Sequence, residues 1–275
     1  MTTRLELRHD ALRILTLTNP AAKAAAARAL DVAGPLDRSA VLHSAAMVPG
    51  RPRQPRLVPP DRVPRRTPFT PEGRAAQLHA IAHIEFNAIN LALDAVWRWS
   101  GMPEAYYRDW LRVAQEEALH FTLVAEHLAT FGHTYGDFDA HDGLWIMCER
   151  TSGDLTARMA LVPRTLEARG LDATPPMQAK LRRAGDLRAV EILDLILRDE
   201  IGHVAIGNRW YRWLCARDGL DPVAHYATLA ARHDAPRLKG PLNLDARRQA
   251  GFTASELALA AAAAAPAQSA DGGTP

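Results

Sequence analysis

Apolar residues recur at helical spacing from about residue 71 to residue 216, and no segment alternates between polar and apolar as a strand would. This pattern predicts core helices over residues 72–99, 104–131, 143–169 and 186–213. Pro163 is expected to kink or interrupt the third, and Gly and Pro break the pattern at 101–103, 132–143 and 170–176. The sequence therefore predicts an all-α protein built on a four-helix bundle.

The segments on either side of these helices differ in composition. Residues 5–17 and 20–33 predict short helices, whereas residues 49–71 carry eight prolines and six arginines and predict an extended strap. The chain thus divides into an N-terminal helical extension with a Pro/Arg-rich strap (1–70), the bundle (71–235) and a C-terminal extension (236–275). The last ten or so residues, rich in Ala, Gly and Pro, are expected to be disordered.

Composition and charge limit the partners and the cellular compartment that the sequence allows. The net charge of +2 gives no argument for nucleic acid or membrane, and 48% hydrophobic residues suffice for a core. Only Cys148 and Cys215 are present, and the N-terminus lacks the apolar core of a signal peptide. The alanine run at 257–265 is too short to cross a bilayer. These features predict a cytoplasmic protein without a membrane span.

Two copies of one short pattern carry the candidate chemistry. Glu117-Ala-Leu-His120 and Glu200-Ile-Gly-His203 each place a carboxylate and an imidazole on the same side of a helix. Glu85 lies 32 residues before Glu117, and Glu167 lies 33 residues before Glu200. One Glu from each of two helices plus one Glu-x-x-His from each of two others is the ligand set of a di-iron or di-manganese four-helix bundle.

Helical phase supports this interpretation for the first pair. Glu85 lies about 180° from a polar stripe on its helix and shares a face with apolar residues such as Ile81, Ile89 and Val96. The stripe comprises His79, His83, Asn87, Asn90 and Asp94. A lone carboxylate on an apolar face needs compensation, either by a cation or by an arginine partner or a proton. Glu85 and Glu117 also lie at similar distances from the turn at 101–103, so they would meet at similar depth in an antiparallel pair.

The third helix leaves an alternative open. Glu167 and Glu149 fall on the same face, and phase alone allows either as the sixth ligand. The nearly equal spacing favours Glu167, although it lies near its predicted helix end. On the neighbouring helices, Asp199 is a candidate to accept a hydrogen bond from a ligand histidine, and Glu116 and His127 either support the site or face solvent.

These residues also resemble known families. Glu85, Glu167 and the two Glu-x-x-His motifs resemble the di-iron pattern of the ferritin-like superfamily. The segments at 79–85, 167–172, 194–207 and 241–247 resemble an uncharacterised bacterial ferritin-like family, formerly labelled a domain of unknown function. A more distant similarity, in the Glu-Ala-Arg context of Glu167, is to the di-iron hydroxylase of isopentenyl-modified tRNA adenosine. The resemblance implies a four-helix bundle with two metals and favours Glu167 over Glu149.

Three functions remain open at this point. The first is a di-iron oxygenase or hydroxylase, which would need dioxygen, an electron donor, a small substrate and two Fe, with Mn as the alternative metal. The second is a protein handling peroxide or iron without an organic substrate, and the third is a bundle whose metal is structural or lost. Six tryptophans either wall a substrate pocket or belong to the core: Trp97, Trp99, Trp110, Trp145, Trp210 and Trp213.

The arginine-rich strap has two interpretations. Its six arginines either form ion pairs with carboxylates on the bundle surface or bind an anionic partner such as RNA. The absence of interleaved aromatic residues favours ion pairs within the chain. A homodimer is the oligomer that the sequence leaves open.

Overall fold

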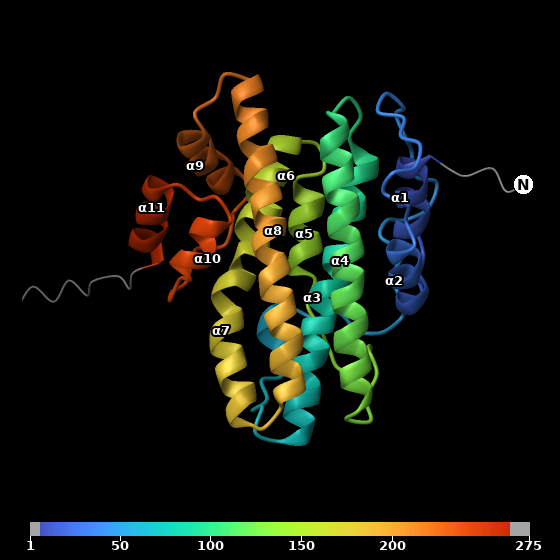
Figure 1. Ribbon diagram of the computed structural model, residues 1–275, viewed down its shortest axis with the longest axis vertical. Coiled ribbons are helices and arrows are strands. Elements are labelled where there is room, and N and C mark those ends of the chain that lie inside the picture. Colours follow the sequence, from blue (N-terminus) through green and yellow to red (C-terminus); the bar gives the residue numbers. More distant parts are fainter. Residues whose placement is uncertain (1–5, 265–275) are drawn as a thin grey trace, which may run out of the picture.

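The computed structural model describes residues 6–264, and helices make up most of this part of the chain (Figure 1). Between residues 6 and 264 the only β-type pairing is an isolated bridge between Leu57 and Ala140. The all-α prediction is therefore confirmed. The expected disorder of the last residues lies outside the described part of the chain, as residues 265–275 are not described.

Helices α3 (Pro71–Arg98) and α4 (Glu104–Ala129) form the first antiparallel pair, and both agree with the predicted ranges to within two residues. The side chain of Thr70 accepts a hydrogen bond from the amide of Gly73, and Pro71 occupies the first helical position, where its missing N–H costs nothing. Gly101, at φ +78°, makes the turn into α4. This turn places Glu85 and Glu117 on facing helices.

Helix α8 (Leu187–Arg217) is the longest in the described chain, and its start matches the prediction. The carboxylate of Asp186 accepts a hydrogen bond from the amide of Ala189 at 3.1 Å, which caps the helix. The same carboxylate contacts His127 Nε2 at 2.8 Å. His127, one of the candidates to support the site, therefore holds the start of α8 instead.

The predicted third helix is wrong as one continuous element. The structure divides it into α5 (Gly143–Arg150), α6 (Leu155–Leu161) and a π-helix, η2 (Val162–Glu167), which continues as α7 (Ala168–Arg183). Pro163 does interrupt the α-helical pattern, because the π-helix begins beside it. These segments lie beside α8 and α3 in Figure 1, so they complete the helical core.

The predicted break at 170–176 is also wrong, since α7 runs through Pro175 and Pro176. Proline lacks the N–H that would donate to the carbonyl four residues earlier, so Pro175 frees the carbonyl of Leu171. The side chain of Asn243 donates to that carbonyl at 3.2 Å. A residue distant in sequence thus replaces the hydrogen bond that proline removes, and the helix continues.

The N-terminal segment covers α3 and α4. Helices α1 (Leu7–Leu15) and α2 (Pro20–Arg28) are shorter than predicted and pack on these two helices. Arg8 is fully buried and donates to the carbonyls of Val96 and Trp97 at the end of α3. The buried ammonium of Lys23 donates to Asn90 Oδ1 at 2.6 Å and to the carbonyl of Gly50 at 2.8 Å. These contacts attach the extension firmly to the core.

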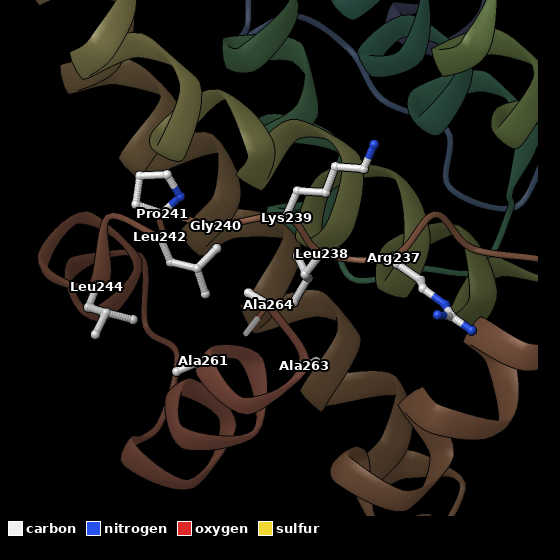
Figure 2. Close-up of a pocket in the computed structure, with 10 residues that line it drawn as sticks. All are labelled: Arg237, Leu238, Lys239, Gly240, Pro241, Leu242, Leu244, Ala261, Ala263 and Ala264. Atoms are coloured by element: carbon white, nitrogen blue, oxygen red, sulfur yellow. The ribbon is translucent and has the colours of Figure 1, made fainter. Parts of the chain in front are cut away.

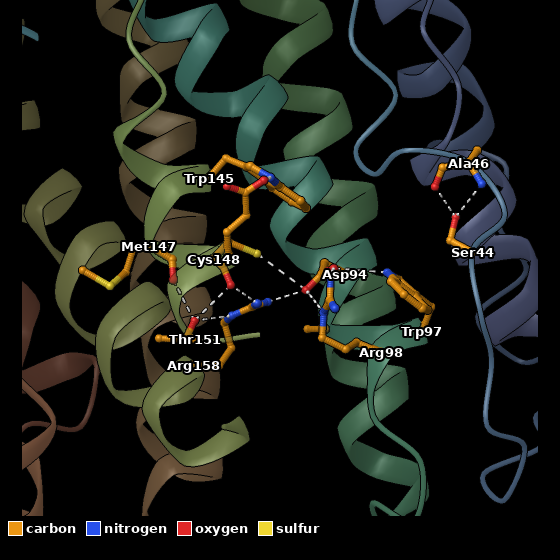
Figure 3. Close-up of polar contacts among 12 residues, drawn as sticks. Ser44, Ala46, Asp94, Trp97, Arg98, Trp145, Met147, Cys148, Thr151 and Arg158 are labelled. Atoms are coloured by element: carbon orange, nitrogen blue, oxygen red, sulfur yellow. Dashed lines mark hydrogen bonds and ion pairs between the residues drawn. The ribbon is translucent and has the colours of Figure 1, made fainter. Parts of the chain in front are cut away.

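The polar stripe of α3 lies beneath this cover and is buried along its whole length. His79 Nε2 accepts from the amide of Gly136 at 2.9 Å, and His83 Nδ1 lies 2.9 Å from the hydroxyl of Tyr135. At the other end of the stripe, Asp94 pairs with Arg98 and Arg158 and links α3 to α6 (Figure 3). Helix α3 therefore has two buried faces, one on this network and one that carries Glu85.

The strap is extended, apart from one 3-10 turn, η1 (Pro60–Arg62), which the prediction of purely extended chain missed. Its backbone exchanges two hydrogen bonds with Ala140, from Val58 and to Arg56. Ion pairs join Arg51 to Asp142 at 2.7 Å, Arg56 to Asp139 at 2.5 Å and Arg66 to Glu72 at 3.3 Å. Half of the six strap arginines are thus paired with carboxylates of this chain.

Helices α9 (Pro222–Arg232), α10 (Leu244–Gln249) and α11 (Ala254–Ala264) form a group beside α8 and α7 (Figure 1). Phe252 and Leu257 join Leu171 of α7 and Val204 of α8 in a small apolar cluster. Within residues 6–264, none of the helices has the length and apolar character that crossing a membrane requires.

Candidate metal centre

Four helical segments contribute the candidate ligands. Glu85 comes from α3, Glu117 and His120 from α4, Glu167 from the last position of η2, and Glu200 and His203 from α8. Glu117 and His120 are fully buried, and Glu85, His203 and Glu200 are 3%, 1% and 8% exposed. Ile81, Ile89 and Val96, which share the apolar face of α3 with Glu85, are buried as well. The core thus holds a group of charged side chains that burial alone would destabilise.

Four of these six side chains converge on one point, and His203 contacts two of the four. Ligand atoms of Glu85, Glu117, His120 and Glu200 all lie within 4.8 Å of one another. His120 Nδ1 lies 3.3 Å from an oxygen of Glu85 and 3.3 Å from an oxygen of Glu117. His203 Nδ1 lies 2.9 Å from Glu117 and 3.9 Å from Glu200. Both histidines therefore direct Nδ1 towards the carboxylates.

The outer nitrogens of the two histidines bind carboxylates from the opposite helix. His120 Nε2, on α4, lies 3.1 Å from Asp199 on α8, and His203 Nε2, on α8, lies 2.7 Å from Glu116 on α4. The hydrogen bond from His120 is the largest cause that lowers the pKa of Asp199, so this carboxylate is ionised and only accepts. Nε2 of His120 therefore donates to Asp199, and a metal bound at Nδ1 would replace the proton on that nitrogen.

This geometry agrees with the predicted role of Asp199 as a hydrogen-bond acceptor for a ligand histidine. For Glu116 the sequence allowed a place at the site or on the surface, and the contact with His203 places it at the site. The sequence contained a signal that would have decided it. An acidic residue directly precedes the glutamate of both motifs, as Glu116-Glu117 and Asp199-Glu200. Two helices that face each other with the same pattern place each outer carboxylate beside the other helix's histidine.

Glu167 and Glu149, the two candidates for the sixth ligand, have different surroundings in the structure. The charges of Glu200, Glu117 and Glu85 act on Glu167, whose Oε2 is buried without a hydrogen-bond partner. Glu149 is exposed on α5 and accepts a hydrogen bond from Trp145 Nε1 at 2.8 Å. Glu167 is not among the four side chains whose ligand atoms lie within 4.8 Å of one another, so its role as the sixth ligand stays a prediction.

The protonation of the cluster reflects its burial. Burial raises the pKa of Glu85 to about 8, and neighbouring Glu117 adds to this effect. Burial and the charge of Glu200 raise the pKa of Glu167 well above its usual value. Burial opposes the charge of His120, but hydrogen bonds to Asp199, Glu117 and Glu85 raise its pKa to about 12. Without a metal, protons on imidazoles and carboxyls balance the charge.

A metal ion would balance the negative charge of this donor set. Oε2 of Glu167 and Oε2 of Glu200 are buried without a hydrogen-bond partner, whereas Oε2 of Glu85 and Oε1 of Glu117 lie 3.3 and 2.9 Å from histidine Nδ1 atoms. Four ionised carboxylates with two neutral imidazoles would neutralise two divalent cations in the core. Oxygen-rich sites with one nitrogen per ion suit Fe or Mn. The buried Glu/His cluster could therefore hold metal.

Two glycines of α8, Gly202 and Gly207, lie close in sequence to the candidate ligands Glu200 and His203. A Cβ on Gly207 would lie 2.6 Å from Cβ of Pro163, so this glycine lets η2 approach α8. Nothing lies within 4 Å of the position that a Cβ on Gly202 would take. Close approach thus explains Gly207 and leaves Gly202 without a packing reason.

Two surface hollows lie in different places. The smaller, of about 220 Å³, is lined by Arg28, Gln115, Glu116 and Leu119 and therefore lies outside the Glu116–His203 contact. The larger, of about 810 Å³, lies between residues 237–244 and α11 (Figure 2). None of the six tryptophans lines either hollow. Four of them belong to the core, which agrees with their structural interpretation: Trp97, Trp110, Trp145 and Trp210.

Comparison with known proteins places the chain in a family. The model of a family described as a protein of unknown function, DUF455, matches residues 15–258. A protein of Haemophilus influenzae that bears the name "Uncharacterized protein" is 56% identical over 213 residues, which cover 75% of this chain and 74% of that protein. No solved structure matches. The chain therefore belongs to the DUF455 family.

Proposed function

We propose that this protein is a carboxylate-bridged di-iron protein of ferritin-like four-helix type that activates oxygen to oxidise a small substrate. One observation carries the proposal: ligand atoms of Glu85, Glu117, His120 and Glu200 lie within 4.8 Å of one another in the core, and His203 Nδ1 lies 2.9 Å from Glu117. This set matches the ligand pattern of dimetal bundles. We propose iron as the metal, with manganese as the alternative.

Each residue of the candidate centre would have a defined role. Glu85, Glu117, Glu167 and Glu200 would hold the ions, and His120 and His203 would each give one nitrogen. Iron in such a site supplies the oxidising power. Asp199 and Glu116 keep the proton on each Nε2 and fix the direction of each ring. The apolar residues around Glu85 and Glu117 exclude water from the site.

An alternative function is peroxide or iron handling without an organic substrate. Tight burial favours it, because Glu117 and His120 are fully enclosed and Glu200 is 8% exposed. Such access suits a small oxidant or an iron ion. The two functions differ in whether an organic compound is oxidised when oxygen is consumed.

The deciding experiment combines metal analysis with oxygen mixing. Protein purified from iron-supplied cells should contain about two iron ions per chain. After anaerobic reduction, mixing with oxygen in a stopped-flow spectrometer should give rapid oxygen consumption and a transient change in visible absorption. Protein that binds only zinc, or reduced protein inert to oxygen, would contradict the proposal. Oxygen consumption without oxidation of any candidate substrate would favour the alternative.

The remaining requirements are proposals as well. Repeated turnover as an oxygenase would need dioxygen, an electron donor and an unidentified small substrate. The two cysteines, Cys148 and Cys215, are buried and unpaired, which supports a reducing compartment such as the cytoplasm. We keep a homodimer as the oligomeric proposal and do not favour RNA as a partner, because three strap arginines already pair within the chain.

A further inference from the structure

The π-helix that carries Glu167 is held from outside by residues 243–256, which we call the C-terminal brace. Arg164 in η2 is 5% exposed and donates to Glu256 at 2.7 Å and to Asn208 at 2.6 Å. Glu256 also accepts from Arg212 at 2.7 Å and from the amide of Thr253 at 2.8 Å. The carboxylate that fixes Arg164 is therefore itself fixed by both α8 and the chain before α11.

Aromatic rings enclose the same guanidinium. Its central carbon lies 5.1 Å from the ring centre of Tyr211, 5.2 Å from that of Tyr226 and 4.9 Å from that of Phe252. A planar guanidinium stacks well on aromatic faces, whereas an ammonium in its place would not. Arg164, three residues before Glu167, thus has one defined position.

The brace also holds the chain after Glu167. Arg247 is 2% exposed and donates to Asp172 through two hydrogen bonds, at 3.0 and 2.6 Å. It donates as well to the carbonyl of Ala168 at 3.3 Å, directly after Glu167. Asn243 supplies the bond to the carbonyl of Leu171 that Pro175 cannot give. Glu167 therefore lies between two anchored points.

Its own helix gives Glu167 less support. Pro163 lacks a donor N–H, and the π-helix has a wider turn than the α-helices on either side. The hydroxyl of Thr165 donates to the carbonyl of Ala160, but it too is held from outside, by the hydroxyl of Tyr226 at 2.9 Å. The direction of the Glu167 side chain then depends on what fixes η2 from outside.

We infer that the C-terminal brace positions Glu167, so that Arg164, Glu256 and Arg247 act as positioning residues of the metal centre. The inference rests on the proposed function. The hydrogen bonds and ion pairs of the brace reach η2, α7 and α8 beside the candidate ligands, so it would act by keeping the η2 backbone in the arrangement that directs Glu167 inwards. Loss of the Arg164–Glu256 pair should lower the affinity for the metal ion that Glu167 binds and leave the affinity for the other ion unchanged.

The test is a titration of the metal-free, full-length protein with Co²⁺. Calorimetry measures the affinity for each ion, and visible absorption reports the ligands around it. Wild-type protein should bind two ions per chain. Glu256→Gln should retain one of them and bind the other about 10–100-fold more weakly, as is typical when a residue supporting a ligand is changed. The visible spectrum of the second equivalent should change as well, because one ligand is displaced. Circular dichroism should show unchanged helix content.

Two controls separate positioning from general loss of stability. Asp245→Asn breaks a surface pair with Arg248 within α10, and Asp221→Ala removes the side chain that caps α9. Both should bind two ions with wild-type affinity, although Asp221→Ala should lower the melting temperature. If Glu256→Gln does not fold, Asp172→Asn, which breaks the pair with Arg247, should give the same selective loss.

The outcomes distinguish the two proposals. Wild-type protein that binds fewer than two ions would overturn the proposed function, and this inference with it. A different result would overturn the inference alone. In that case the wild-type protein binds two ions, and the Glu256→Gln or Asp172→Asn protein binds the second ion with unchanged affinity. Equal weakening of both ions in these variants would also overturn it, since the brace would then stabilise only the fold.

Discussion

Glu116 of α4 lies 2.7 Å from Nε2 of His203 on α8, and its own helix-mate Glu117 lies 2.9 Å from Nδ1 of the same ring. One imidazole is thus held between two consecutive carboxylates, one on its outer side and one at the cluster. His120 has the corresponding contact with Asp199 on α8. Each helix of the pair therefore orients the histidine of the other.

We expect loss of an outer carboxylate to weaken metal binding without removing a ligand. Glu116→Gln and Asp199→Asn should each lower the affinity for one metal about 10–100-fold, because the imidazole loses its fixed direction and its strongest acceptor. Calorimetric titration with Co²⁺ gives the affinities. Glu126→Gln, an exposed change on α4, serves as the matched control. Wild-type affinity in both outer variants would contradict this role.

Much of the cluster could be predicted because its residues lie on regular amphipathic helices. The phase of α3 placed Glu85 on an apolar face, and the repeat of Glu-x-x-His placed Glu117 and Glu200 towards the same interior. In a regular helix, spacing alone fixes which residues share a face. The structure indeed brings these side chains together.

The third helix could not be predicted, because its course depends on partners distant in sequence. Proline and glycine at 170–176 indicate a break, and the side chain of Asn243 satisfies the carbonyl of Leu171 that Pro175 leaves without a donor. The buried stripe of α3 has a similar origin, since Lys23 satisfies Asn90 from a separate helix. Local pattern contains no information about such contacts.

We expect the ligand histidines to be required for metal but not for folding. His120→Ala and His203→Ala should each lose at least one metal and all oxygen consumption, because each would leave one ion without its nitrogen. The apo fold should persist, because a buried carboxylate that loses its imidazole partner can take up a proton instead. Metal analysis and circular dichroism test both points, with the exposed His9→Ala protein as control. A histidine variant with full metal content would contradict the ligand set.

The strap should contribute stability rather than bind RNA. Arg51→Ala removes a partly buried pair with Asp142 and should lower the free energy of unfolding by about 1 kcal/mol. Arg53→Ala, an exposed change in the same segment, should have little effect. Fluorescence anisotropy with a labelled RNA should show only weak binding. Tight, salt-sensitive binding lost in Arg51→Ala, Arg53→Ala and Arg56→Ala proteins would reverse this interpretation.

Lys23 should make stability depend on pH in the alkaline range. Burial, assisted by the charge of Arg51, lowers the pKa of Lys23 from 10.5 to about 7. Between these values the unfolded chain holds a proton that the folded chain has released, so the free energy of unfolding rises with pH. Below pH 7 both states are protonated, and the cost of the buried charge is constant.

Lys23→Met should abolish this dependence. Relative to that variant, wild-type protein should gain at most about 3 kcal/mol between pH 7 and pH 9.5, as measured by urea unfolding. Other groups that titrate in this range are the same in both proteins and cancel in the difference. Lys180→Met, at an exposed position of α7, should leave the slope unchanged. Parallel curves for wild type and Lys23→Met would show that Lys23 keeps its proton in the folded state.

The choice between Glu167 and Glu149 gives the most direct test of the ligand set. The charges of Glu200 and Glu117 help to raise the pKa of Glu167, whereas Glu149 is exposed and bonded to Trp145. Glu167→Ala should therefore bind one metal fewer per chain, or bind it at least about 10-fold more weakly. It should also fold stably, because a buried carboxyl with an unpaired oxygen is removed.

Glu149→Ala should keep both metals and lose only the surface hydrogen bond from Trp145. Inductively coupled plasma analysis of both proteins, purified in parallel, measures the difference. Two metals in the Glu167→Ala protein and one in the Glu149→Ala protein would reverse the assignment and place the sixth ligand on α5.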